Sequence, residues 1–190
     1  EILIKNGYND EVLDKRVKTK MKKDNCTVYQ AYYSTYKEIL KENDIQFNRA
    51  NICEGAENVN LNKGVVDYFK NVQYKETGIK HYIVTSGLQE YIYETPIKNY
   101  IQGVYGVTFK EENGIYTDLD ILLDDKKKVD AIKKIITENN NDTDIIYLGD
   151  GLTDKKAFEF VHSLGGKTVF IAQGENPILK YNKINETGII

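Results

Sequence analysis

The stretch "DIIYLGDGLTD" (Asp144–Asp154) decides the expected fold of this chain. Its short apolar run is bounded by turn-forming residues, which predicts a buried β-strand. The glycines on both sides of Asp150 let the backbone turn sharply, so this carboxylate is expected to lie exposed at the end of the strand. Because ligands of open α/β sheets bind beyond the carboxyl ends of the strands, the stretch predicts a binding edge as well as a strand.

Two further runs have the same form, "KHYIVTSG" (80–87) and "KTVFIA" (167–172). Segments with helical spacing lie between the three runs, and this alternation predicts an α/β fold with a parallel sheet flanked by helices. Three places lie at the expected carboxyl ends of the strands: Thr85–Gly87, Gly149–Gly151 and Ala172–Gly174.

The first part of the chain, to about residue 55, reads as helical and charged. Thr27 followed by Gln30 predicts a capping box at the start of one helix. Further along, Asn113-Gly114 predicts the tight turn of a β-hairpin within 103–122.

Composition limits the classes of partner. The 190 residues include 26 Lys and Arg against 29 Asp and Glu, and a net charge of -3 argues against nucleic-acid and membrane-surface binding. The two cysteines, Cys26 and Cys53, are far apart and favour a reducing compartment. No apolar run approaches the roughly 18 residues that span a membrane, so we expect a cytoplasmic protein. The pattern does not encode an oligomeric state.

The two acids of the opening stretch, Asp150 and Asp154, predict a metal site. Carboxylate oxygens are the ligands that Mg²⁺ prefers, often with several waters retained. The alternative reading is that Asp154 caps the following helix and Asp150 forms an Asx turn. A Gly-Asp-Gly turn directly after an apolar strand favours the metal.

A hydroxyl group lies at the end of the first predicted strand, on Thr85 or Ser86. Backbone N–H groups at the start of the next helix would lie beside it, and such a helix start favours an anion, above all phosphate. The alternative reading is an ordinary N-cap.

Lysines 126–128 lie at the start of a predicted helix. Cations there oppose the helix dipole, so a lysine kept at this place suggests a compensating anion. Lys128 has the helical phase of Ala131, Ile132 and Ile135 and is expected to face inward, whereas Lys126 and Lys127 are expected to be solvated. A hydroxyl, an ammonium and a metal site at neighbouring strand ends suit phosphoryl transfer.

In their order, "HYIVTSGLQEYI" (81–92), "KKKVDAIKKI" (126–135) and "IIYLGDGLTDKKAFEFVHSLGG" (145–166) resemble the haloacid dehalogenase-like (HAD) hydrolases, and among them the phosphoserine-phosphatase-like branch. The resemblance covers roughly residues 60 to 175. It implies a Rossmann-like core over 59–190 and a small helical cap over 1–58.

The resemblance also implies roles for individual residues. Thr85, or Ser86 in its place, would bind the transferring phosphoryl group together with Gly87. Lys128 would neutralise the nucleophile and the phosphate. Asp150 would bind Mg²⁺, and Asp154 would support the metal directly or through a hydrogen-bonded partner.

One motif of these hydrolases, an apolar strand ending in DxDxT, has no match before Thr85. Its first Asp is the nucleophile and its second the general acid–base. The DxD formed by Asp118 and Asp120 lies in the predicted hairpin and lacks the apolar strand. We therefore expect the nucleophile upstream of Glu1.

The leading hypothesis is a Mg²⁺-dependent phosphatase that hydrolyses a small phosphorylated metabolite through a phospho-aspartyl intermediate. The alternative is a non-catalytic α/β module that binds a phosphorylated ligand or a protein partner.

Overall fold

The computed structural model describes residues 3, 6–72, 77–142, 144–171, 181–182 and 185. Its helices and strands are α2 (Asp10–Asp24), α3 (Val28–Glu42), α4 (Arg49–Ile52), η1 (Ala56–Asn58), α5 (Val65–Asn71), β1 (Tyr82–Leu88), α7 (Gln89–Ile92), η2 (Lys98–Tyr100), β2 (Gly103–Glu112), β3 (Ile115–Ile121), α8 (Asp125–Glu138), β4 (Ile146–Gly149), η3 (Leu152–Asp154), α9 (Lys155–Ser163) and β5 (Lys167–Phe170). The elements expected from the sequence are present, and the α/β class is confirmed.

Two compact units make up the chain. The first contains Glu1–Ile83 and Gly87–Leu122, and the second contains Val84–Ser86 and Leu123–Ile190. The predicted boundary between residues 58 and 59 falls inside the first unit, and the assignment of cap and core stays a prediction. No helix in the described ranges is long and apolar enough to cross a membrane.

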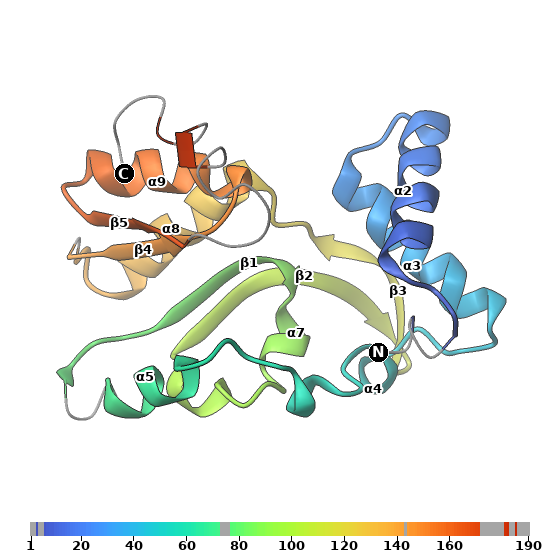
Figure 1. Ribbon diagram of the computed structural model, residues 1–190, viewed down its shortest axis with the longest axis horizontal. Coiled ribbons are helices and arrows are strands. Elements are labelled where there is room, and N and C mark those ends of the chain that lie inside the picture. Colours follow the sequence, from blue (N-terminus) through green and yellow to red (C-terminus); the bar gives the residue numbers. More distant parts are fainter. Residues whose placement is uncertain are drawn as a thin grey trace. The chain divides into compact units, whose positions relative to one another are not determined.

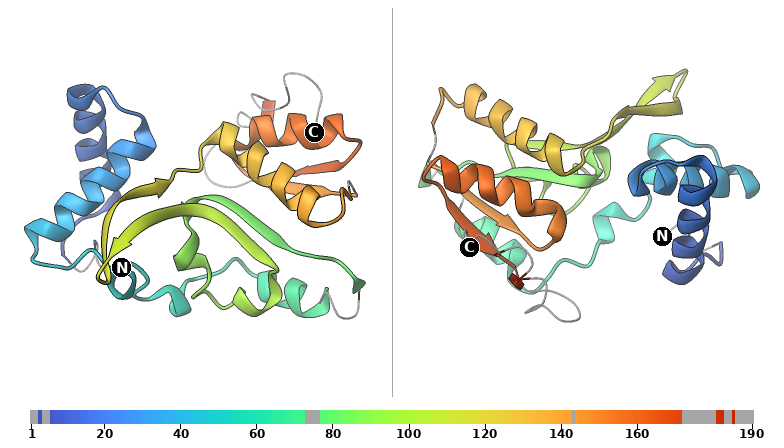
Figure 2. Two further views of the ribbon diagram at one scale, coloured as in Figure 1. Left: turned by 180° about the vertical axis from the view of Figure 1, so that it is seen from behind. Right: turned by 90° about the horizontal axis from the view of Figure 1, so that it is seen from above.

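The second unit contains the parallel pair. β4 and β5 run in register from Ile146 beside Lys167 to Gly149 beside Phe170. Helix α9 lies next to both strands (Figure 1), and the views of Figure 2 agree. The core of this unit consists of Ile132, Ala157 and Val161, with Val84, Ile136, Ile145, Tyr147 and Phe160 packed against it.

Alternation along β4 separates its two faces. Tyr147 faces the core, whereas Ile146 and Leu148 are 60% and 56% exposed. A strand residue's position in this alternation therefore decides whether it can reach the buried side chains of α8 and α9.

The first unit contains the predicted hairpin. β2 and β3 are antiparallel, and the sheet order is β1-β2-β3. Asn113 and Gly114 have φ angles of 52° and 80°, the left-handed conformation that a tight two-residue turn requires. By the hydrogen bonds of the described residues, β1 pairs in the sheet of the hairpin and not with β4 or β5, although its residues Val84–Ser86 are grouped with the second unit. The hairpin packs on an aromatic core that includes Tyr33, Phe47, Phe109 and Tyr116.

Helices α2 and α3 pack against each other in the first unit. The predicted capping box is present: the Thr27 side chain accepts from the Gln30 amide, and the Gln30 side chain accepts from the Thr27 amide. Apolar side chains join the two helices, namely Leu13, Val17, Ala31 and Ile39.

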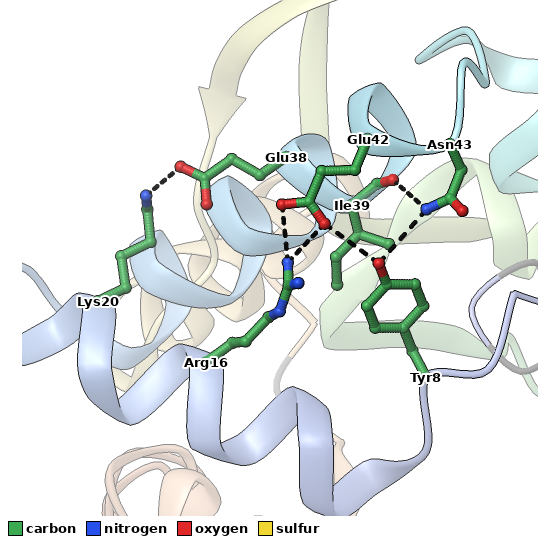
Figure 3. Close-up of polar contacts among 7 residues, drawn as sticks. All are labelled: Tyr8, Arg16, Lys20, Glu38, Ile39, Glu42 and Asn43. Atoms are coloured by element: carbon green, nitrogen blue, oxygen red, sulfur yellow. Dashed lines mark hydrogen bonds and ion pairs between the residues drawn. The ribbon is translucent and has the colours of Figure 1, made fainter.

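Polar contacts surround this apolar seam (Figure 3). Arg16 Nη1 lies 2.8 Å from Glu42 Oε2, and the Tyr8 hydroxyl donates to the same carboxylate at 3.1 Å. Lys20 pairs with Glu38 one turn further along. The hydrogen bond from Arg16 lowers the pKa of Glu42. These contacts hold α2 against α3.

Candidate functional site

Asp154 is the centre of the polar cluster in the second unit. Its residue exposure is 5%, and its carboxylate accepts four hydrogen bonds. Oδ1 accepts from Lys128 Nζ at 2.7 Å and from the Tyr147 hydroxyl at 2.8 Å. Oδ2 accepts from the backbone N–H groups of Asp150 at 3.2 Å and Gly151 at 3.1 Å. Since an ionised carboxylate offers about four acceptor sites, its capacity is used up within the protein.

The local backbone explains how Asp154 reaches these partners. β4 ends at Gly149, and the short helix η3 turns the chain back before α9 begins. A Cβ atom at position 149 would lie 2.8 Å from both Cβ and Cγ of Asp154, closer than packed atoms can come. Glycine at 149 therefore permits the close approach of the Asp154 side chain to the end of the strand.

Lys128 enters the cluster from the first turn of α8. Asp124 caps this helix by accepting from the Lys127 amide. Lys128 is 6% exposed, beside the buried Ala131 and Ile132 of the same helix. Lys126 and Lys127 are exposed, as their phase predicted. The pair of Lys128 and Asp154 is thus buried, with side chains that are each 7% exposed.

Asp150 differs from Asp154 in exposure and in hydrogen bonding. Its residue is exposed at the carboxyl end of β4. Within the ranges that the structure describes, its carboxylate takes part in no ion pair or hydrogen bond, although its amide is held by Asp154. Of the two acids, Asp150 is the one whose oxygens are available to a cation.

The alternative reading of Asp154 as an ordinary helix cap is only partly met. Asp154 stands at the N-cap position of α9, but its side chain makes no cap hydrogen bond to that helix. It instead accepts from the two amides that precede η3. Asp154 therefore anchors the Gly-Asp-Gly turn.

Thr85 and Ser86 are half-buried on β1, next to Val84, which packs on the core of the second unit. The N-cap of α7 is Leu88, without a side-chain cap bond, so neither hydroxyl has the N-cap role considered for it. Gly87 is exposed and belongs to the first unit. A role of either hydroxyl in binding an anion stays a prediction.

The remaining predicted positions lie elsewhere. Residues 172–174, the third expected strand end, lie outside the described residues. Asp118 and Asp120 are exposed on β3 in the first unit, and Asp118 lies 3.9 Å from Lys37.

A metal would have one carboxylate ligand at this place. No group of three or more His, Cys, Asp or Glu side chains that could hold a metal ion occurs among the described residues. Mg²⁺ retains several waters and is bound through one or two carboxylates together with substrate phosphate oxygens. The exposed Asp150 carboxylate therefore fits Mg²⁺ and would not suffice for a metal held by protein ligands alone.

Two members of the cluster were missed by the sequence reasoning. Tyr147 donates to Asp154, and the Thr153 hydroxyl lies 3.4 Å from Lys128 Nζ. The alternation of β4 could have identified Tyr147, because a polar tip on the covered face of a strand needs a partner.

Comparison with known proteins identifies the fold of the chain. No protein-family model matches the sequence, and no curated protein matches it either. Among solved structures, a HAD family hydrolase from Salmonella enterica subsp. enterica serovar Typhi matches over 84% of this chain and 53% of its own, with a TM-score of 0.63 and 16% identity. A probable phosphoserine phosphatase from Vibrio cholerae matches over 94% of this chain and 62% of its own, with a TM-score of 0.51 and 10% identity.

The chain thus spans between half and two thirds of the length of these two structures. At 16% and 10% identity the likeness establishes the fold. The chain therefore has the α/β fold of the HAD-like hydrolases.

Proposed function

We propose that this chain belongs to a Mg²⁺-dependent phosphatase that hydrolyses a small phosphomonoester. The observation that carries the proposal is the difference in burial and hydrogen bonding between Asp150 and Asp154. Asp154 is buried and fully hydrogen-bonded, and Asp150 is exposed beside it with a carboxylate that has no partner among the described residues. The buried acid holds the backbone amide of the exposed one, which fixes the place from which the Asp150 carboxylate extends.

Each residue has a role in this proposal. Asp150 would bind Mg²⁺, which when bound supplies positive charge to the phosphate oxygens. Lys128, held by Asp154, would place its ammonium near the transferring phosphoryl group. Thr85 or Ser86 would donate a hydroxyl hydrogen bond to a phosphate oxygen.

In this proposal the attacking group would be an aspartate upstream of Glu1. An aspartate carboxylate would attack phosphorus and the substrate alcohol would leave, which gives a phospho-aspartyl intermediate that water then hydrolyses. The fold that this chain shares with the two structures above, and the Gly-Asp-Gly turn of the chain itself, support this reading. The substrate would be a small phosphorylated metabolite, and the compartment the cytoplasm.

Turnover of a generic aryl phosphate tests the proposal on the full-length protein, with Mg²⁺ titrated. We expect Asp150→Asn to reduce Mg²⁺-activated turnover at least tenfold, and Lys128→Met to do the same. Matched controls are Asp120→Asn, an exposed acid on β3, and Lys127→Met, the exposed neighbour of Lys128. Full activity of Asp150→Asn would contradict the proposal.

The same assay separates the non-catalytic alternative. A wild-type protein that binds Mg²⁺ and inorganic phosphate but never releases phosphate from the aryl ester would be a binding module. An intact mass above the 21.9 kDa of these residues would lead to a search for DxDxT in the additional segment.

A further inference from the structure

Tyr147 belongs to the cluster and has no role in the proposed function. Its ring lies on the covered face of β4 and packs edge-on against Phe158, with centroids 5.3 Å apart and planes at 87°. Phe158 is 1% exposed. Packing of the ring against Phe158 does not involve the hydroxyl, so a phenylalanine at this position would keep its place.

The Tyr147 hydroxyl makes the polar contact of this side chain. It donates to Asp154 Oδ1 at 2.8 Å, the same oxygen that accepts from Lys128 Nζ. Burial, followed by the charge of Asp154, raises the pKa of Tyr147 far above its ordinary value, so the hydroxyl stays protonated and remains a donor.

The two donors at Oδ1 orient the carboxylate of Asp154. Lys128 reaches Oδ1 through a long side chain with four rotatable carbon bonds, whereas the tyrosine hydroxyl comes from a rigid ring. With Oδ1 fixed, Oδ2 stays directed at the amides of Asp150 and Gly151. Loss of the hydroxyl would leave Oδ1 with one flexible partner, and the carboxylate could rotate away from the turn.

We propose that Tyr147 is a positioning residue that acts through Asp154 to hold the Asp150–Gly151 turn, and with it the metal-binding carboxylate of Asp150. The effect on metal binding rests on the proposed function. The effect on the turn does not, because it follows from the hydrogen bonds alone.

Tyr147→Phe removes the hydroxyl and keeps the ring. Tyr8→Phe is the matched control, since the Tyr8 hydroxyl also donates to a carboxylate, that of Glu42, in the other unit. Amide hydrogen exchange by NMR without metal is the first measurement. Exchange at Asp150 and Gly151 should become faster in Tyr147→Phe relative to the core amide of Val161, because a loss of global stability would accelerate all three.

The second measurement is Mg²⁺ affinity by titration of the same folded samples. We expect Tyr147→Phe to weaken Mg²⁺ binding about tenfold, the low end for loss of a partner behind a metal ligand. Tyr8→Phe should leave both measurements unchanged. Where Asp154→Asn folds, adding Tyr147→Phe to it should change neither measurement further, since the tyrosine acts through Asp154.

Three results decide the inference. Unchanged exchange at Asp150 and Gly151 in Tyr147→Phe would overturn it. Faster exchange with unchanged Mg²⁺ affinity would overturn the link from the turn to the metal. If the wild type binds no Mg²⁺, the proposed function fails, while the exchange rates still decide whether Tyr147 holds the turn.

Discussion

Replacement of Lys128 by methionine should destabilise the protein by about 3 kcal/mol. The change removes the ammonium, keeps the apolar stem and leaves the buried Asp154 carboxylate with three neutral donors. Breaking a buried ion pair on one side typically costs about 3–5 kcal/mol, because the remaining charge has no counter-ion. The three remaining hydrogen bonds to Asp154 place the expected value at the low end of this range.

The reverse change, Asp154→Asn, should cost more, about 4–5 kcal/mol. It leaves the Lys128 ammonium with the Thr153 hydroxyl at 3.4 Å, a long contact. The new amide group would also direct N–H groups toward the ammonium or toward the backbone amides of the turn. The double variant carries no unpaired charge, so its cost should fall below the sum of the single costs by about 2–3 kcal/mol.

Urea unfolding followed by circular dichroism measures these free energies. Arg16→Met is the control, because its partner Glu42 is at the surface and the side chains are 39% and 48% exposed. This variant should lose far less stability, since exposed pairs contribute little. A cost below about 1 kcal/mol for Lys128→Met, or additive costs in the double variant, would refute a charge-compensated buried pair.

Three further changes are expected. Gly149→Ala should cost about 2 kcal/mol in urea unfolding, because the added methyl group meets the fixed Asp154 side chain at 2.8 Å. Cys53 is 8% exposed and burial raises its pKa, so alkylation at pH 8 followed by peptide mass spectrometry should show Cys26 modified first; equal rates would contradict this. Burial lowers the pKa of His81 in the folded protein. As the pH falls, the imidazole therefore takes up its proton in the unfolded state before it does so in the folded state. The free energy of unfolding should decline as the pH falls below about 6.5 toward the folded pKa. His81→Gln should flatten this decline, measured by urea unfolding at pH 7 and pH 5, and an unchanged slope would argue against it.

Local signals predicted most of the secondary structure. The capping box at Thr27 and the Asn113-Gly114 turn depend on neighbouring residues only, and both are present. The inward phase of Lys128 was readable because the buried Ala131 and Ile132 follow it at helical spacing. In each case the physical cause lies within one helical turn or one hairpin turn of the residue concerned.

Pairing across the sequence was not readable in the same way. Lys128 and Asp154 are separated by 26 positions, and their contact depends on how α8 packs beside η3. The membership of β1 in the hairpin sheet is likewise a matter of long-range pairing, which strand composition alone does not encode. Sequence spacing suggested two metal-binding acids, Asp150 and Asp154. It could not show that the carboxylate of Asp154 accepts four hydrogen bonds within the protein.

The difference between the two acids follows from the turn that separates them. Two neighbouring carboxylates that both carried an uncompensated charge would repel each other. In this chain η3 directs Asp154 inward, where Lys128 compensates its charge, while the amide of Asp150 is tied to it and the Asp150 side chain points away from the protein interior. The buried acid thus holds the turn and has its charge compensated, whereas the exposed acid has no ion-pair partner among the described residues. A cation attracted to this edge of the sheet would therefore meet Asp150 first, and the strength of its binding would depend on the hydrogen bonds that hold Asp154 in place.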